Sequence, residues 1–157
     1  MTLYQSAIQC HEGTNKPIAQ GINYQGIGLV YLEQNKPTEA EDALQMALRF
    51  HKTTNSSLGL GNGYHILGRI YLELQRLEDA KVACGKALEN HKLANSALGQ
   101  GNDHQLLGRI HLFQGELNEA EISFKKALEL HAMANSASSQ IDDTSFLKKK
   151  YERRVPS

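Results

Sequence analysis

Apolar residues recur with the spacing of helices along most of the chain. Two such series follow one another in the middle of the sequence: Leu67, Ile70, Tyr71 and Leu74, then Leu77, Ala80, Cys84, Ala87 and Leu88. Intervals of three and four residues are typical of amphipathic helices, each with one apolar face. Turn-forming residues separate the equivalent series elsewhere, at 35–37 and 114–116. We therefore predict pairs of helices joined by short turns, in which neither helix can bury its apolar face alone.

The predicted helical pairs recur with a period of forty residues, the spacing of Gly28, Gly68 and Gly108. Other columns share this spacing: Ala47, Ala87 and Ala127; His51, His91 and His131; Asn55, Asn95 and Asn135. Repeats of ~20–50 residues indicate a solenoid. We predict an all-α fold, a right-handed superhelical solenoid of antiparallel helix hairpins. Its three units are expected at residues 17–55, 56–95 and 96–135.

These residues resemble the tetratricopeptide repeat family, whose pattern is aromatic-x-x-Leu-Gly-x-x-Tyr followed by Ala, a bulky residue and Ala. The matching positions are Tyr24, Ile27, Gly28, Tyr31, Ala40, Leu44 and Ala47; Tyr64, Leu67, Gly68, Tyr71, Ala80, Cys84 and Ala87; and His104, Leu107, Gly108, His111, Ala120, Phe124 and Ala127. The unit departs from the usual length of thirty-four residues, and Lys52, Lys92 and Ala132 replace the usual proline. Such extended repeats are similar to those of kinesin light chains, G-protein-signalling modulators and the sensor arrays of some signalling ATPases. The resemblance implies a protein-binding scaffold rather than an enzyme.

The resemblance extends toward both ends, so residues 1–157 are expected to form one solenoid. Four residues of the N-terminal segment fit the columns of a second helix: Ala7, Ile8, His11 and Asn15. Residues 1–15 are therefore predicted to be an orphan second helix of a preceding repeat. Residues 137–154 are predicted to form a polar capping helix, because Lys148 replaces the glycine of the pattern and a solenoid needs a solvated end.

Composition and charge narrow the classes of partner. The 157 residues carry 17 Lys and Arg against 17 Asp and Glu, and 40% of them are hydrophobic. The chain is too apolar to be disordered, and it lacks the ~20 consecutive apolar residues of a membrane span. Its basic residues are scattered and form no cluster of the kind that binds nucleic acid or an acidic membrane. The N-terminal sequence is unlike a secretory signal, so we expect a cytoplasmic protein with no nucleic-acid or membrane partner.

A curved stack of hairpins has a concave groove lined by the first helix of each pair, where solenoids bind peptides. The face opposite the apolar stripe supplies the predicted partner-binding residues: Asn62, His65, Arg69, Leu72, Glu73, Asn102, Gln105, Arg109, Leu112 and Phe113. A guanidinium presents a planar fork of donors that suits carboxylates. Arg69 and Arg109 therefore predict a protein or peptide partner that is acidic or rich in amides. Relatives that bind chaperone tails use Lys, Asn and Arg at places that here hold Gln25, Leu29, Ile66, Asn102 and Leu106, so that function is not expected.

Histidines and glycines invite two other interpretations. His51, His91 and His131 lie one repeat apart, too far for a shared metal ion, and are expected near helix ends where the dipole favours histidine. The segment Gly-Leu-Gly-Asn-Gly at 59–63 superficially resembles a phosphate-binding loop. It has no preceding strand, and we expect its glycines to loosen the start of a helix instead.

The sequence predicts no catalytic constellation, metal site or cofactor. The two cysteines, Cys10 and Cys84, lie nearly two repeats apart. A disulfide needs Cα atoms within about 7 Å of each other, so both residues are expected to be buried or half-buried thiols. We therefore expect a binding protein and not an enzyme.

Two alternative functions remain open. In the first, the chain is a sensor or regulatory fragment of a larger signalling protein, and the orphan helix marks missing repeats. In the second, the N-terminal helix drives assembly into a homo-oligomer through an exposed apolar surface. The residues predicted for that surface are Leu3, Tyr4, Ala7 and Ile8.

Overall fold

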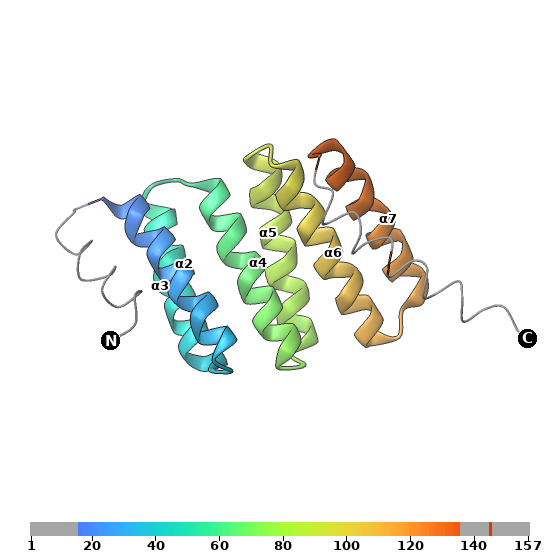
Figure 1. Ribbon diagram of the computed structural model, residues 1–157, viewed down its shortest axis with the longest axis horizontal. Helices are drawn as coiled ribbons and strands as arrows, with labels where there is room; N and C mark the ends of the chain where they lie inside the picture. The colour runs from blue at the N-terminus through green and yellow to red at the C-terminus, as the bar shows by residue number, and fades with distance from the viewer. Residues whose placement is uncertain (1–15, 136–144, 146–157) are drawn as a thin grey trace, which may run out of the picture.

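Six helices in three antiparallel pairs make up the described part of the protein, residues 16–135 and residue 145 of a computed structural model (Figure 1). Their bounds are α2 Pro17–Glu33, α3 Pro37–Thr53, α4 Ser57–Glu73, α5 Leu77–Leu93, α6 Ala97–Gln114 and α7 Leu117–Met133. The prediction of an all-α array of helix hairpins is confirmed. The orphan helix predicted for 1–15 lies outside the described residues, as does the capping helix predicted for 137–154 apart from Ser145.

Each of these helices is followed by a residue in the left-handed backbone conformation. At the ends of α3, α5 and α7 this residue is Asn55, Asn95 or Asn135, with φ angles of 50°, 51° and 55°. Asparagine tolerates that conformation better than most L residues, which explains why it closes every unit. The next backbone N–H completes the turn, since that of Ser56 donates to the carbonyl of His51 at 2.9 Å. The chain thereby reverses sharply into the next helix.

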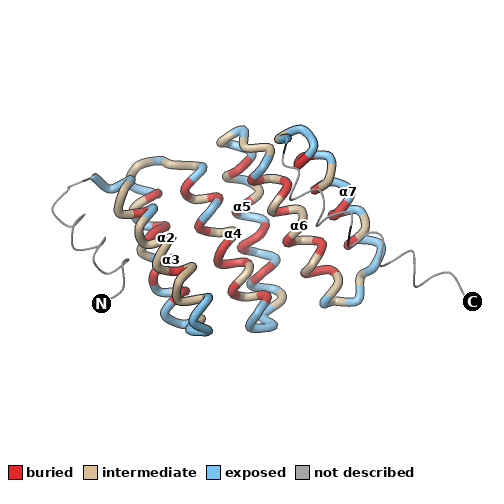
Figure 2. The backbone as a smooth tube through the Cα atoms, viewed as in Figure 1, coloured by how far each residue is buried: buried red, intermediate tan, exposed pale blue. Residues whose placement is uncertain are grey.

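Small residues let the two helices of a pair approach closely. Ala80 of α5 is completely buried, and a Cβ built on Gly68 of α4 would lie 3.4 Å from its carbonyl oxygen. Larger apolar side chains such as Leu44, Leu67 and Ile70 fill the remaining space and form the core. Figure 2 shows the buried residues as stripes along the helices, interrupted by exposed positions. Removal of this apolar surface from water, at roughly 25 cal/mol per Å², holds the stack together.

The first helices of the pairs form one layer of the array. Helix α4 contacts α2 and α6 as well as its own partner α5, and α5 also contacts α6. A first helix in the middle of the array is therefore packed on several sides, against its partner and against both neighbouring units. This arrangement places side chains of α4 and α6 on opposite walls of one hollow.

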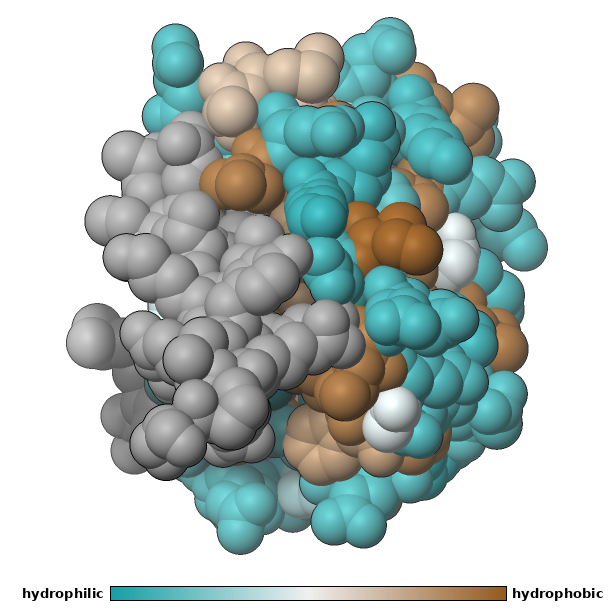
Figure 3. All heavy atoms as spheres, turned by 90° about the vertical axis from the view of Figure 1, so that its right-hand side faces the viewer, coloured by the Kyte–Doolittle hydropathy of each residue, from teal (hydrophilic) through white to brown (hydrophobic). Residues whose placement is uncertain are grey.

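The outer surface mixes polar and apolar side chains. Figure 3 looks onto the α7 end of the molecule, where hydrophobic patches lie among hydrophilic residues. The exposed large apolar residues of α7 include Ile122 and Met133. Across the helices that the structure describes, none combines the length and the apolar character needed to cross a bilayer.

Candidate functional site

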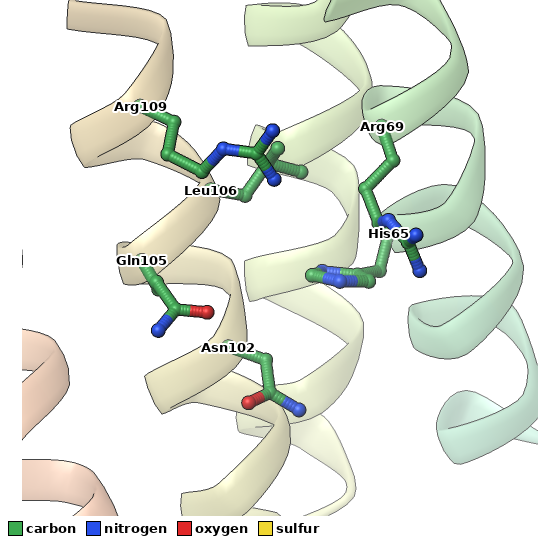
Figure 4. A pocket seen from close by; sticks show the side chains of 6 residues that line it. All are labelled: His65, Arg69, Asn102, Gln105, Leu106 and Arg109. Carbon is green, nitrogen blue, oxygen red and sulfur yellow. The ribbon is translucent and has the colours of Figure 1, made fainter. Parts of the chain in front are cut away.

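A hollow of about 240 Å³ opens between α4 and α6, and we call it the α4/α6 groove. Its lining residues are His65 and Arg69 of α4 with Asn102, Gln105, Leu106 and Arg109 of α6. Figure 4 shows the Arg109 side chain extending from α6 toward α4, while the Arg69 side chain runs along α4 beside His65. Within residues 16–135, neither guanidinium takes part in a hydrogen bond or ion pair, whereas Arg76 is paired with Asp79 at 2.8 Å. Two cationic groups thus face one hollow without a protein partner among these residues.

The structure brings five of the ten residues predicted for partner binding into this groove: His65, Arg69, Asn102, Gln105 and Arg109. Asn62 is exposed on α4 but does not line the groove. Glu73 and Phe113 are exposed at the C-terminal ends of their helices, and Leu112 is half-buried. These last three residues lie outside the groove lining as well.

The prediction was wrong for Leu72, which is 2% exposed and packs in an apolar cluster with Leu106 and Ile110. The physical reason is that α6 covers the side of α4 that was assigned to solvent. The same packing explains why Leu106, which was not among the predicted partner-binding residues, lines the groove. A Cβ built on Gly68 would lie 2.9 Å from Cδ2 of Leu106, so the missing side chain at Gly68 makes room for this leucine.

Asn62 and Asn102 repeat for a structural reason. Oδ1 of Asn62 lies 3.0 Å from Nε2 of His91, and Oδ1 of Asn102 lies 3.0 Å from Nε2 of His131. Both histidines are buried near the ends of their helices, and each asparagine supplies a partner that a buried ring nitrogen requires. The two columns therefore repeat together as bonded pairs. The amide nitrogen of Asn102 lies on the side facing α4 in Figure 4.

Asp103 is a buried carboxylate behind the groove. It is 0% exposed, with Oδ2 at 2.6 Å from Nδ1 of His91 and Oδ1 at 2.9 Å from Nδ1 of His65. A buried charge is costly unless it is paired, and the two imidazoles provide that pairing. Asp103 was not predicted from the sequence, because its column holds Asn23 and Gly63 in the other units. The only available signal was an acidic residue inside a helix that packs on several sides.

Glycines of the first helices form slots for the buried histidines. A Cβ built on Gly59 would lie 2.3 Å from Nδ1 of His51, and one built on Gly21 would lie 2.6 Å from Cε1 of the same ring. The His51 ring is therefore enclosed between α4 and α2, and His91 is enclosed between α4 and α6 in the same way. The expectation that the glycines of 59–63 loosen a helix start was wrong. Helix α4 is continuous through this segment, and the glycines permit close packing.

His51 lacks the polar partners of its equivalents. Among the described residues, neither of its buried ring nitrogens has a hydrogen-bond partner. Ile22 occupies the column of Asn62, and Gly63 occupies that of Asp103. Burial lowers the pKa of His51 and so favours the neutral ring. The first unit thus contains an incomplete version of the polar cluster behind the groove, which consists of Asn62, His65, His91 and Asp103.

Ile22→Asn is expected to raise the free energy of unfolding by about 1 kcal/mol, because its Oδ1 would accept a hydrogen bond from Nε2 of His51. Ile22 is 57% exposed, so little buried apolar surface is lost. The matched control is Ile18→Asn, at a residue 56% exposed on the same helix, which should change stability by less than about 0.5 kcal/mol. Urea denaturation at neutral pH measures both. Equal changes in the two variants would contradict the expected hydrogen bond to His51.

Stability should also depend on pH through these neutral histidines. Burial lowers the pKa of His51 and is the largest cause of the lowered pKa of His104, so the unfolded chain binds protons more readily than the folded protein. This contribution to stability is present above the pKa of the unfolded state and is lost as the pH falls through the folded value. We expect the free energy of unfolding to decrease between about pH 7 and pH 5. Denaturation at stepped pH measures it, and a flat profile would contradict the expectation.

Cys84 offers no reactive thiol. Burial, with a smaller contribution from the charge of Asp103, raises the pKa of this thiol to about 12. Its Sγ donates to the carbonyl oxygen of Asp103 at 3.1 Å, and the side chain is buried as predicted. Cys10 lies outside the described residues. Within the part of the chain that is described, no group of three or more His, Cys, Asp or Glu side chains is placed to hold a metal ion.

The helical array has a counterpart among solved structures. It is similar in fold to the crystal structure of BtubC (BKLC) from P. vanneervenii, with a TM-score of 0.72, 13% sequence identity, and coverage of 99% of this chain and 74% of that one. No curated protein matches the sequence. Models of the tetratricopeptide repeat match residues 24–57, 62–90 and 104–131, one match for each helical pair. Together these ranges cover more than half of the sequence, and the chain belongs to the tetratricopeptide repeat family.

Proposed function

We propose that this chain is a protein-interaction module that binds an acidic segment of a partner in the α4/α6 groove. Tetratricopeptide arrays are generally protein–protein interaction modules and are typically not catalytic. The observation that carries the proposal is the pair Arg69 and Arg109, which line one hollow from neighbouring first helices. A guanidinium can hold a carboxylate through two parallel N–H···O bonds. Two of them, one repeat apart, suit an acidic peptide that runs across the helices.

The other lining groups favour hydrogen-bond acceptors as well. Oδ1 of Asn102 is bonded to His131, so the amide nitrogen is the group that Asn102 offers to a ligand. Among the residues that the structure describes, the groove lining contains no carboxylate that would repel an anion, and Asp103 behind it is buried and paired. Backbone carbonyls of an amide-rich segment would accept from Asn102 in the same way. These features support an acidic partner over a basic one.

The test is fluorescence anisotropy with a labelled peptide of aspartate and glycine, compared with a peptide in which each aspartate is replaced by asparagine. The aspartate peptide is expected to bind roughly tenfold more tightly than the asparagine peptide, since charge-assisted hydrogen bonds are about twice as strong as neutral ones. The double variant Arg69→Ala, Arg109→Ala should weaken binding of the aspartate peptide by roughly 10- to 100-fold.

The matched control is Arg49→Ala, which removes an exposed arginine of α3 that does not line the groove. It should leave the affinity unchanged, and circular dichroism should show the same helical content in all variants. Loss of binding with Arg49→Ala as large as with the double variant would indicate a general charge effect and reject the groove. Equal affinities for the two peptides would reject the acidic partner.

Self-association remains a separate prediction. Its residues, Leu3, Tyr4, Ala7 and Ile8, lie outside the described residues, so the groove proposal does not depend on them. A role as a regulatory fragment of a larger signalling protein also stays a prediction from the sequence, as does the cytoplasmic compartment.

A further inference from the structure

We infer that Asp103 is a positioning residue that fixes His65 so that protonation of its Nε2 adds a third cation to the α4/α6 groove. Acid should therefore tighten the binding of a carboxylate. This inference rests on the proposed function, because it concerns the same groove and the same class of ligand. Asp103 acts only through His65, since it is completely buried and does not line the groove.

The hydrogen bonds of Asp103 determine which nitrogen of His65 can change its charge. Oδ1 of Asp103 lies 2.9 Å from Nδ1 of His65. An ionised carboxylate only accepts hydrogen bonds, so Nδ1 carries a proton in both charge states of the ring. Nε2 is then the atom that gains or loses a proton. The His65 side chain is 20% exposed and lines the groove.

Asp103 is itself held in place by the units on both sides of it. Its second oxygen lies 2.6 Å from Nδ1 of the buried His91, whose Nε2 lies 3.0 Å from Oδ1 of Asn62. Its backbone carbonyl accepts from Sγ of Cys84 at 3.1 Å. The chain of contacts from Asn62 through His91 and Asp103 to His65 is continuous. A groove-facing imidazole with buried support of this kind has a fixed tautomer and orientation.

The charges around His65 set the direction of the effect. Arg69 lies on the same helix and Arg109 on α6, while Asp103 of α6 and His91 of α5 lie behind the ring. Helix α2 carries no ionisable residue between Gln25 and Val30. A bound carboxylate would attract a positive charge on His65, so proton uptake and peptide binding favour each other by linkage.

The first measurement is nitrogen NMR of the protein with labelled histidine, which reports the tautomer of each ring. At about pH 8, His65 is expected to carry its proton on Nδ1. Asp103→Asn should abolish that fixed tautomer, with circular dichroism as the check that the variant is folded. An Nε2–H tautomer of His65 in the parent protein would overturn the inference.

The second measurement is the affinity for the labelled aspartate peptide at about pH 8 and about pH 5.5, where aspartate stays ionised. Binding by the parent protein should tighten roughly five- to tenfold at the lower pH. His65→Gln should lose the tightening. His104→Gln, which removes a histidine next to Asp103 in sequence but outside the groove lining, should keep it.

The outcomes separate this inference from the proposed function. Tightening that persists in His65→Gln, or affinity that is independent of pH in the parent, would overturn the inference and leave acidic-peptide binding intact. Absence of binding at either pH would overturn the proposed function. The tautomer measurement would then decide whether Asp103 positions His65.

Discussion

Asp103→Ala is expected to lower the free energy of unfolding by about 3–5 kcal/mol, the largest effect of any substitution considered for this protein. Asp103 is 0% exposed, and its carboxylate accepts from His91 at 2.6 Å and from His65 at 2.9 Å. Its removal leaves Nδ1 of the buried His91 without an acceptor, which carries the full penalty of an unsatisfied buried group. Urea denaturation followed by circular dichroism measures the loss.

Asp79→Ala is the control for this prediction. Asp79 also pairs with a basic side chain, Nε of Arg76 at 2.8 Å, but both partners of that pair are exposed to solvent. Solvent screening makes such pairs worth less than about 1 kcal/mol, so Asp79→Ala should have a small effect. A comparable loss in the two variants would show that burial of Asp103 is not the source of its effect.

Gly59→Ala is expected to destabilise the protein by about 2 kcal/mol, although alanine favours helices over glycine. The new Cβ would lie 2.3 Å from Nδ1 of His51, a contact that forces the ring or the helix to move. The ring has little room to yield, because Gly21 of α2 encloses its other side at 2.6 Å. Overpacking of this kind in a filled interior typically outweighs the gain in helix propensity. Thermal or urea denaturation measures the difference.

Gly85→Ala provides a control of opposite sign. Gly85 lies in α5, and a Cβ built there meets nothing within 4 Å. The substitution should stabilise the protein by up to about 1 kcal/mol, through helix propensity and a less flexible unfolded chain. In a His51→Ala background, Gly59→Ala should lose most of its cost, since the clashing ring is gone. An undiminished cost in that background would mean that the clash with His51 is not the cause.

The fold follows from the repetition of the sequence, because a pattern copied three times identifies helix faces that one copy would leave ambiguous. The forty-residue period and the asparagine after each unit together predict the hairpins and their turns. Leu72 shows the limit of this reasoning. A helical pattern identifies one buried face, but a first helix inside a solenoid packs against the next unit as well.

The groove was partly predictable because Arg69 and Arg109 repeat on the face of their helices opposite the predicted apolar stripe. The polar cluster behind it was not, since its members come from three helices, with His91 and Asn62 29 positions apart in sequence. The recurrence of Asn62 and Asn102 suggested ligand binding, but of the two only Asn102 lines the groove. Their recurrence also reflects their contacts with buried histidines, which only the packing of neighbouring helices reveals.

The buried carboxylate of Asp103 has a consequence for how such an array evolves. Duplication of the second unit would copy Arg69 and Asn62, but at the position of Asp103 it would copy Gly63. The added unit would therefore lengthen the scaffold without creating a second supported imidazole. The site is also shared between two units, so neither unit would carry it when grafted alone into another protein. Within the three described units, an imidazole supported by a buried carboxylate in this way therefore lies only at the junction of the second and third.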